Sequence, residues 1–522
     1  MTERRGGQPS VADLTIPTKR TLPDEPNGTR AMSQVMEIRT VVRNIYACFF
    51  ITGAVSLVYQ VLWLRKLLLV FGSTVHAVST VLTVFFGGLA LGSWWFGRAI
   101  DRRQGAGLRW YAALEAGVGL YALMTPWLFD AIQHVYIPLY RASGFSPAVL
   151  VGASFVCAAI ILLVPTTLMG GTFPVLSRFL ILTSQERGVK FAGLYGINTA
   201  GAMIGTLLVY FAGLPVLGLF RTLVSAAVLN LGVAALCLVF DRHLESLEFR
   251  APASDSPDQE RGQDGPSGHV RWLFLAFGLS GFSAMVYEVA WTRVLSLVLG
   301  SSIYAFCIML ATFLGGIALG SGLSRRVLRR QPASLGQFIR IEVFLGLYAI
   351  CSILLFNQLP QWFVTLWPLT GNSFSGLLAL QGILSVIAMI FPTVLMGLLF
   401  PLVSDLVTVQ FAQLGRRLGS AYAINTLGGI AGSFLSGFVL IPSLGLPWAI
   451  VVAGVVNLSA GGLLYVRFGK AASAMRLAVT AAGLLGAVVF SQTLIIPTWQ
   501  RQVFAAGAVS YTHLTLPTKR IV

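Results

Sequence analysis

The sequence predicts an all-α polytopic membrane protein with two parallel six-helix repeats and one extra C-terminal apolar helix, giving 12 or 13 spans. Three observations predict this fold class: the composition, a series of apolar stretches of membrane-spanning length, and an internal repeat that covers most of them. The repeat also pairs residues between the two halves, because equivalent positions should have equivalent surroundings.

The composition requires lipid as the solvent. Of the 522 residues, 56% are hydrophobic and only 11% are charged, whereas soluble domains carry about 25% charged residues. A water-soluble core could not bury so much apolar surface. We attribute the net charge of +17 to Lys and Arg that hold loops against anionic lipid. No basic stretch interleaved with aromatic residues indicates nucleic-acid binding.

The sequence carries no motif of metal or nucleophilic chemistry. The five cysteines all lie in apolar stretches without metal-ligand spacing, and we expect them to be packing residues. There is no Walker loop, zinc spacing or nucleophile elbow, and no polar stretch is long enough for a catalytic domain. The sequence therefore predicts no metal, no cofactor and no catalytic residue in this chain.

Apolar stretches of about 20 residues, the length that crosses a bilayer, recur along the chain. Twelve of them fall at 44–64, 74–97, 108–130, 147–180, 191–217, 220–240, 271–296, 302–325, 337–362, 377–404, 418–440 and 446–467, and one more at 475–496. The stretches at 147–180 and 377–404 contain Pro and Gly, which allows tilted or broken helices there.

Basic residues predict the topology. Segments such as "RAIDRRQGAGLR" (98–109) and "SRRVLRRQP" (324–332) fall on one side of the spans, while the loops on the other side carry almost no charge. The positive-inside rule places the basic side and the N-terminus in the cytoplasm. The resulting division is a disordered cytoplasmic tail at 1–40, membrane repeat 1 at 41–240, a cytoplasmic linker at 241–270, membrane repeat 2 at 271–467, and an extra transmembrane or re-entrant helix at 475–496.

The internal repeat is the strongest signal in the sequence. Residues 52–93 align without a gap on residues 280–321, and 20 of the 42 positions are identical. Further matches are "PTTLMGGTFPVLS" (165–177) with "PTVLMGLLFPLVS" (392–404), and "YGINTAGAMIG" (195–205) with "YAINTLGGIAG" (422–432). With six spans in each repeat, the halves have the same orientation. They are parallel repeats about an axis along the membrane normal, as in the two halves of major facilitator transporters.

Charged residues inside these spans are the first candidates for a substrate or ion site, because charge in lipid is costly and usually functional. Glu288 and Arg293 both lie in "VYEVAWTR" and are five residues apart, which is roughly 140° around a helix. Because this spacing does not put them on one helix face, we expect each to meet a partner on another helix. The first repeat, "VYQVLWLR", has Gln60 in place of the acid but keeps Arg65. This difference favours a specific role for Glu288.

Aromatic residues accompany these charges in both repeats. Tyr287 and Trp291 are four residues apart and share a helix face, as do Tyr59 and Trp63. One interpretation is an aromatic belt at the membrane interface. The other is that Tyr287 and Trp291 belong to the site.

Two further repeated pairs are polar. Glu115 and Glu342 occupy equivalent positions near the starts of the third and ninth spans. Buried acids there could bind a cation, a proton or a cationic substrate, and the alternative is a half-exposed position at the cytoplasmic boundary. Asn198 and Asn425 sit in the repeated "INT". We expect each to hydrogen-bond a neighbouring helix, with lining of a site as the alternative.

Glycine spacing predicts close helix packing. "FFGGLALGS" and "FLGGIALGS" place Gly88 four residues before Gly92 and Gly316 four before Gly320. Small residues at this spacing let helices approach closely.

The segment "GRAIDRR" (97–103) resembles the Gly-Asp-Arg-rich loop that follows the second helix of major facilitator transporters. The resemblance implies a cytoplasmic loop motif at Arg98, Asp101 and Arg102. The second repeat has arginine where the first has the acid, which argues against a charge-relay role there.

Together, "VYQVLWLR/VYEVAWTR", "GGLALGS/GGIALGS", "PTTLMGGTFP/PTVLMGLLFP" and "YGINTAG/YAINTLG" resemble the membrane part of a bacterial fused family, a facilitator-like module followed by a spermidine synthase domain. The resemblance covers about 41–508 and implies a multi-pass protein of the bacterial inner membrane. It also implies a polyamine aminopropyltransferase that uses decarboxylated S-adenosylmethionine. None of that domain's residues occurs here, and "PTWQRQVFAAGA" (497–508) resembles the lead-in to it.

The last residues, "VSYTHLTLPTKRIV" (509–522), are too few and too polar to span a membrane, and nothing in the other half repeats them. They resemble the translation of a sequencing-library adapter, and we expect a non-native scar. Thirteen spans from a cytoplasmic N-terminus would place residue 497 outside. Either 475–496 does not span, or one earlier span is wrong, or the family's soluble domain faces outward.

Three functions remain open at this point. The chain is the membrane module of a polyamine-synthase-like fusion that moves or presents a small cationic or amphipathic metabolite, a stand-alone transporter of another substrate, or a non-transporting membrane anchor.

Overall fold

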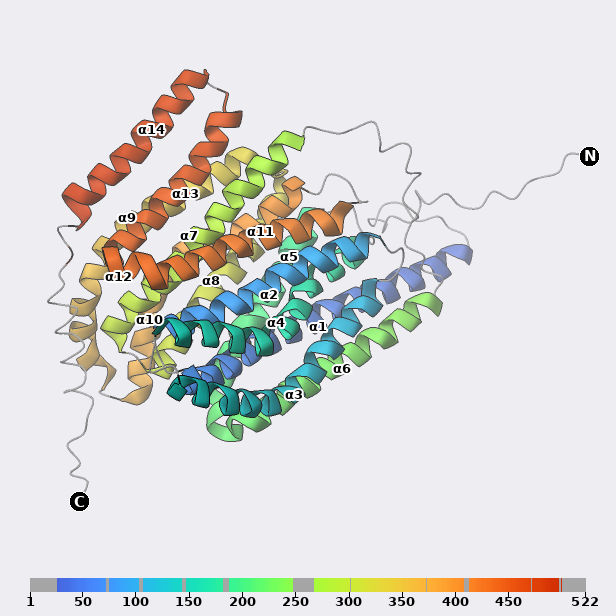
Figure 1. Cartoon of the computed structure of the whole chain (residues 1–522). Coiled ribbons are helices and arrows are strands. Elements are labelled where there is room, and N and C mark those ends of the chain that lie inside the picture. Colours follow the sequence, from blue (N-terminus) through green and yellow to red (C-terminus); the bar gives the residue numbers. More distant parts are fainter. Residues whose placement is uncertain are drawn as a thin grey trace, which may run out of the picture.

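The computed structural model describes residues 26–71, 75–102, 107–142, 147–181, 187–246, 267–300, 302–371, 373–407, 413–470, 472–496 and 499. Within these ranges the chain is almost entirely helical and contains no β-strand (Figure 1). Twelve segments of the described chain are long and apolar enough to cross a membrane, and the longest, Gly188–Glu245, holds two helices. The predicted all-α membrane fold is confirmed.

Each half of the molecule contributes six long helices. In the first half they are α1 (Pro26–Phe71), α2 (Val75–Asp101), α3 (Gly107–Ala142), α4 (Pro147–Ile181), α5 (Arg187–Leu208) and α6 (Gly218–Ser246). In the second half they are α7 (Ser267–Leu299), α8 (Ile303–Arg330), α9 (Leu335–Leu366), α10 (Phe374–Val407), α11 (Leu414–Leu435) and α13 (Leu446–Phe468). The short α12 (Ile441–Leu444) precedes α13, and α14 (Ser473–Phe490) follows it.

The internal repeat is visible in the irregular backbone as well. A π-helical segment follows α5 at Val209–Leu217, and another follows α11 at Ser436–Leu440. Each leads to a glycine in the left-handed region, Gly218 with φ 71° and Gly445 with φ 82°. Only glycine adopts this backbone without strain. The same turn therefore starts α6 in the first half and α13 in the second.

Glycines bring helices together inside each half. A Cβ built on Gly88 would overlap Thr166 Oγ1 on α4, and one on Gly316 would overlap Thr393 Oγ1 on α10. Without side chains at these positions, α2 packs against α4 and α8 against α10 at short range. This is the packing that the glycine spacing predicts.

The helices α4 and α10 are continuous through their prolines, although the sequence allows a break in each. Pro165 and Pro174 lie inside α4, and Pro392 and Pro401 lie inside α10. A membrane helix tolerates proline when Ser/Thr side chains and neighbouring helices satisfy the freed backbone groups. The threonines that directly follow the first prolines, Thr166 and Thr393, donate to carbonyls of their own helices.

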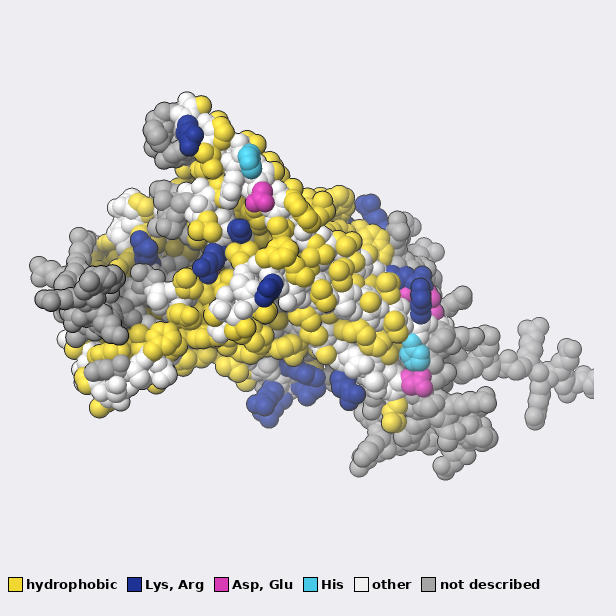
Figure 2. All heavy atoms as spheres, turned by 90° about the horizontal axis from the view of Figure 1, so that it is seen from below, with side chains coloured by type: hydrophobic (Ala, Val, Ile, Leu, Met, Phe, Trp, Pro, Cys, Tyr) yellow, Lys and Arg dark blue, Asp and Glu magenta, His cyan; other side chains and the backbone are white. Residues whose placement is uncertain are grey.

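The two halves meet along two pairs of helices. The helix α2 of the first half packs against α11 of the second, and α5 packs against α8. The ends of α2 and α8 carry Arg98, Arg325, Arg326, Arg329 and Arg330. We call the end of the bundle where these arginines lie the arginine-rich face. Between its ends, the molecule presents hydrophobic side chains over most of the side shown in Figure 2, as lipid contact requires.

The helix α14 lies at the outer edge of the second half, beside α13 and antiparallel to it (Figure 1). Its apolar side chains remain largely exposed, with Leu477 60% and Leu485 66% exposed. The segment Ser473–Ile495 is long and apolar enough to span a membrane. That it is an extra transmembrane or re-entrant helix stays a prediction.

Two predicted boundaries are wrong. Residues 26–40, which the sequence assigns to a disordered tail, are the start of α1, because helix formers fill this segment after Gly28. The predicted linker at 241–270 is shorter, since α6 extends to Ser246 and α7 begins at Ser267. Residues 1–25, 247–266 and 500–522, and most of the predicted lead-in at 497–508, lie outside the described residues.

Candidate functional site

An aromatic cluster joins the two halves near the arginine-rich face. Phe400 of α10 lies at its centre, with ring-centroid distances of 4.7 Å to Tyr195 of α5 and 5.2 Å to Phe173 of α4. On its own side it lies 5.7 Å from Tyr422 and 6.1 Å from Phe277. Rings at these distances in tilted and edge arrangements attract one another beyond simple burial. They close the space between the halves at this depth.

The cluster obeys the internal repeat. Phe173 and Phe400 are equivalent, as are Tyr195 and Tyr422, and Phe277 is equivalent to Phe49, whose ring lies 6.2 Å from Phe173. We call these six residues the aromatic seal.

The repeated asparagines hold the seal in place. Asn198 Nδ2 donates to the carbonyl of Phe49 at 3.1 Å, and Asn425 Nδ2 donates to the carbonyl of Phe277 at 2.9 Å. These are the inter-helix hydrogen bonds that the sequence predicts. Each lies where a glycine, Gly53 or Gly281, allows the backbone of the asparagine to approach.

A second contact between the halves lies at the arginine-rich face, at the loop motif. Asp101, the last residue of α2, pairs with Arg178 of α4 and accepts the backbone N–H groups of Gly415 at 3.0 Å and Arg416 at 2.6 Å. A carboxylate at a helix N-terminus satisfies free N–H groups and favours the helix dipole. Asp101 therefore ties the first half to the start of α11.

Among the described residues, no hydrogen bond or ion pair joins the other two residues of the loop motif to the second half. Arg98 lies over the ring of Trp94, 4.2 Å from its centroid, and donates to the Trp94 carbonyl. Arg102 is exposed. Of the three predicted residues, the structure assigns an inter-half contact to Asp101.

Glu115 and Glu342 are buried inside their own halves, so the half-exposed boundary position considered for them is wrong. Glu115 is 3% exposed and Glu342 is 0% exposed. Asn230 Nδ2 of α6 donates to Glu115 Oε2 at 2.5 Å, and the equivalent Asn457 of α13 donates to Glu342 Oε2. Both acids therefore face peripheral helices, away from the seal between the halves.

Both tyrosine–tryptophan pairs lie in the protein core, so the interpretation that they form an aromatic belt at the membrane interface is wrong. Tyr59 and Tyr287 are 0% exposed, Trp63 is 1% exposed and Trp291 0%. Tyr59 stacks on Trp63 at 5.0 Å, and Tyr287 stacks on Trp291 at 4.8 Å. Four-residue spacing on one helix face produces both stacks.

The hydroxyl groups of the two tyrosines differ. Tyr287 donates to Asn457 Oδ1 at 2.8 Å, which links it to Glu342. The equivalent Tyr59 hydroxyl and Asn230 Oδ1 are both buried without a partner among the described residues.

Glu288 does not behave as the sequence predicts. No hydrogen bond or ion pair joins its partly buried carboxyl to any described residue, so the expected partner on another helix is absent there. It follows Met285 by three residues on α7, on the side that packs against Gly429 of α11. Because α11 also contacts the first half, Glu288 lies toward the interface between the halves.

The two predicted arginines lie apart from this position. Arg65 and Arg293 are both exposed, near the ends of α1 and α7 that lie away from the arginine-rich face. Neither has a charged partner among the described residues. The structure therefore brings neither of them to Glu288.

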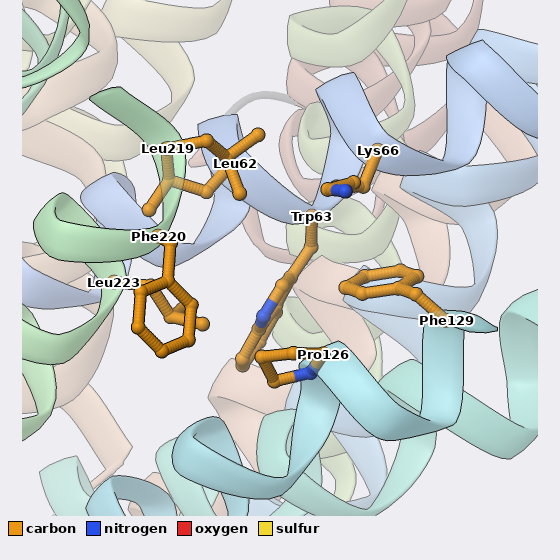
Figure 3. Close-up of a pocket in the computed structure, with 8 residues that line it drawn as sticks. All are labelled: Leu62, Trp63, Lys66, Pro126, Phe129, Leu219, Phe220 and Leu223. Atoms are coloured by element: carbon orange, nitrogen blue, oxygen red, sulfur yellow. The ribbon is translucent and has the colours of Figure 1, made fainter.

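A small cavity of about 60 Å³ lies within the first half, beside Trp63 (Figure 3). Its walls come from α1, α3 and the start of α6, with Lys66, Pro126, Phe129 and Phe220 around the indole ring. Small-molecule sites occupy roughly 300–1,000 Å³. This cavity is therefore too small to hold a metabolite.

The sequence contains signals for the residues that were missed. Phe173 and Phe400 lie inside the repeated "TFPVLS/LFPLVS", and Tyr195 and Tyr422 begin the repeated "INT" segments. Asn230 and Asn457 are identical at equivalent positions of α6 and α13. Side chains kept in register between two halves mark places where both halves need the same contact.

Comparison with known proteins gives partial sequence similarity. No family model matches the chain. It is 25% identical over 261 residues to the polyamine aminopropyltransferase of Mycobacterium tuberculosis (strain CDC 1551 / Oshkosh), covering 47% of this chain and 46% of that protein. It is 24% identical over 193 residues to polyamine aminopropyltransferase 2 of Aquifex aeolicus (strain VF5), covering 37% and 35%. The chain therefore spans less than half of the length of the curated relatives it matches.

Comparison with solved structures gives the fold. A bacterial homologue of the iron transporter ferroportin in an outward-facing state matches 81% of this chain and 98% of its own, with a TM-score of 0.53 and 14% identity. The proton:xylose symporter XylE matches 83% and 96%, with a TM-score of 0.51 and 13% identity. The transporter FucP in the outward conformation matches 82% and 98%, with a TM-score of 0.50 and 15% identity. The chain has the fold of major facilitator superfamily transporters.

Proposed function

We propose that the chain moves a small cationic metabolite between its two halves by alternating access. The observation that carries this proposal is the aromatic seal. Its six residues come in equivalent pairs from both halves and meet between them toward the arginine-rich face. When two halves of this kind rock against each other around a site between them, a closure on one side of the membrane opens while the other side closes.

On this proposal Glu288 binds the cationic group of the substrate. It lies eleven residues beyond Phe277 on α7, which is about 16 Å along the helix axis. Since α7 has its midpoint near residue 283, Glu288 lies about 8 Å beyond that midpoint, behind the seal as seen from the arginine-rich face. We infer that it reaches the mid-membrane region, where transporters of this fold class bind their substrates. An acid without a partner at such a place is costly unless a cation joins it. Its equivalent, Gln60, retains the shape without the charge.

The similarity to polyamine aminopropyltransferases supports a polyamine as the substrate class. The names of those proteins state that they act on polyamines. This chain matches 46% of the length of one and 35% of the length of the other. We further propose that the chain is the membrane module of a spermidine synthase-like fusion protein. Decarboxylated S-adenosylmethionine and the catalytic residues would belong to the synthase part of that fusion, and no residue of this chain is assigned to catalysis.

The test is uptake of radiolabelled spermidine and putrescine into proteoliposomes that contain the purified chain. The key variant is Glu288→Gln, which copies the residue of the first repeat and removes only the charge. Because a charged hydrogen-bond partner contributes about 1.5–3 kcal/mol, we expect at least a tenfold loss of apparent affinity.

The matched control is Asp130→Asn. It removes an exposed acid of α3 and copies the equivalent Asn357 of the second repeat. Uptake by this variant should equal that of the wild type. Equal uptake by Glu288→Gln would exclude Glu288 as the cation site. No uptake of any polyamine or amino acid by the wild type would overturn transport and favour a membrane anchor.

A further inference from the structure

A groove of about 330 Å³ opens on the second half at the arginine-rich face, between α8, α9 and α10. Its walls are mainly apolar, with Val327 and Leu328 from α8, Phe344 from α9 and Leu402 from α10. Phe344 is 59% exposed and Val327 is 37% exposed. Apolar side chains that are exposed in a membrane protein face lipid, so the groove opens toward the bilayer.

The groove exists because the two repeats differ here. In the first half, Phe96 lies on Gly171, and its ring contacts Trp110 at 6.2 Å. The equivalents of Phe96 and Trp110 are Ser324 and Gln337, and both line the groove. In the first half the two aromatic rings fill the crevice over Gly171. In the second half Leu398 replaces that glycine, and the smaller side chains of Ser324 and Gln337 leave the crevice beside it hollow.

Two polar groups at this groove have hydrogen-bonding capacity that the described residues do not use. Ser324 is 3% exposed, and its hydroxyl has no hydrogen-bond partner among the described residues. A buried hydroxyl without a hydrogen-bond partner costs free energy. A bound molecule that accepts a hydrogen bond from it would remove that cost. Gln337 accepts the backbone N–H of Ser334 through Oε1, which leaves its amide N–H₂ as a donor.

Positive charge lies at the mouth of the groove. Arg340 lines it directly from the second turn of α9. Its equivalent in the first half is Ala113, so this charge belongs only to the half that has the groove. The end of α8 adds the exposed Arg325, Arg326, Arg329 and Arg330 at the same face. Arginine binds phosphate oxygens through several N–H groups at once.

We propose that this groove binds one anionic phospholipid of the leaflet at the arginine-rich face. An acyl chain lies against the apolar walls, and the phosphate accepts hydrogen bonds from Arg340 at the rim. A basic pocket between membrane helices at headgroup depth fits an anionic lipid, and the volume lies within the range of small-ligand sites. A soluble polar metabolite does not fit walls that open to lipid. The site lies outside the aromatic seal and does not rest on the proposed transport.

The test is native mass spectrometry of the purified full-length chain after incubation with dioleoylphosphatidylglycerol or, as the neutral-headgroup comparison, dioleoylphosphatidylcholine. We expect the wild type to retain one phosphatidylglycerol in preference to phosphatidylcholine. The triple variant Ser324→Phe/Gln337→Trp/Leu398→Gly copies the filled crevice of the first half, Gly171 included, and should lose that lipid.

Arg340→Ala tests the headgroup separately, because the side chain is exposed and its removal does not disturb packing. It should lower the affinity for phosphatidylglycerol about fivefold, the contribution of one basic residue at an anionic surface. The control is Arg467→Ala, an exposed arginine of α13 that does not line the groove, which should leave binding unchanged.

Equal retention of phosphatidylglycerol by wild type and the filled variant would overturn the proposal, as would equal binding of the two lipids by the wild type. If the filled variant does not fold, Arg340→Ala against Arg467→Ala still decides the result, since a non-specific lipid annulus would respond equally to both.

Discussion

Asp101, at the end of α2, accepts the backbone N–H of Gly415, at the start of α11, across the interface between the two halves. The contact exists because α2 ends in an acid where α11 begins with free N–H groups. Arg178 pairs with the same carboxylate oxygen and neutralises its charge. The aromatic seal and this contact therefore close the same end of the molecule by different means, one apolar and one electrostatic.

The first prediction concerns this contact. Asp101→Asn removes the charge that favours the start of α11 and the ion pair with Arg178. Charged hydrogen bonds contribute about 1.5–3 kcal/mol, so the population that is open at the arginine-rich face should rise at least tenfold. The measurement is the electron–electron distance between spin labels at Arg242 of α6 and Arg329 of α8. Arg102→Gln, at the exposed neighbour of Asp101, should leave the distance distribution unchanged.

The second prediction concerns helix packing. Gly88→Ala would place a Cβ on Thr166, whereas a Cβ on the neighbouring Gly87 meets nothing within 4 Å. Overpacking of this kind costs about 1–3 kcal/mol, and alanine in an open helix position is neutral or favourable. Thermal unfolding in detergent should therefore show a lower midpoint temperature for Gly88→Ala than for the wild type. The midpoint temperature of Gly87→Ala should not fall. Equal midpoints would mean that α2 and α4 can separate at no cost.

The sequence predicted the helices well, because membrane spans are set by local composition. The stretch predicted at 147–180 is the helix Pro147–Ile181, and the one at 446–467 is Leu446–Phe468. The start of α1 was missed because Pro26–Thr40 is a helix-forming segment without an apolar run, and hydropathy does not detect such a segment.

The candidate site was harder to predict, because it depends on which helices face each other. The identity of Glu115 and Glu342 in both repeats singled them out, but only the fold shows that they face Asn230 and Asn457 at the periphery. Conversely, Phe400 is an ordinary apolar residue in the sequence and becomes the centre of the seal only when four other helices bring rings to it. The local hydropathy pattern of a helix does not tell which side chains of other helices it will contact.

The third prediction compares two equivalent tyrosines. Tyr287→Phe removes a hydroxyl that donates to Asn457, and Tyr59→Phe removes one without a partner among the described residues. The first loses a hydrogen bond of about 1 kcal/mol and leaves Asn457 Oδ1 unsatisfied, while the second removes an unsatisfied buried group. We expect unfolding in detergent at a lower temperature for Tyr287→Phe and no loss for Tyr59→Phe. A larger loss for Tyr59→Phe would contradict the difference between the two halves.

The fourth prediction tests whether the aromatic seal holds one end closed. Phe400→Ala removes the ring that contacts Phe173 and Tyr195 of the other half. Loss of two inter-half ring pairs, each worth about 0.5–1.5 kcal/mol beyond burial, should favour separation of the halves at the arginine-rich face. The distance between spin labels at Arg242 and Arg329 should then shift toward the longer population.

Phe220→Ala is the matched control, because it removes a phenylalanine that is 62% exposed on α6 and belongs to no inter-half ring pair of the described residues. Combining Phe400→Ala with Asp101→Asn separates the two closures. If seal and ion pair act on one opening motion, the two free-energy changes should add, since the sites share no partner. A double variant that opens no further than Asp101→Asn alone would show that the seal packs the halves without controlling the opening.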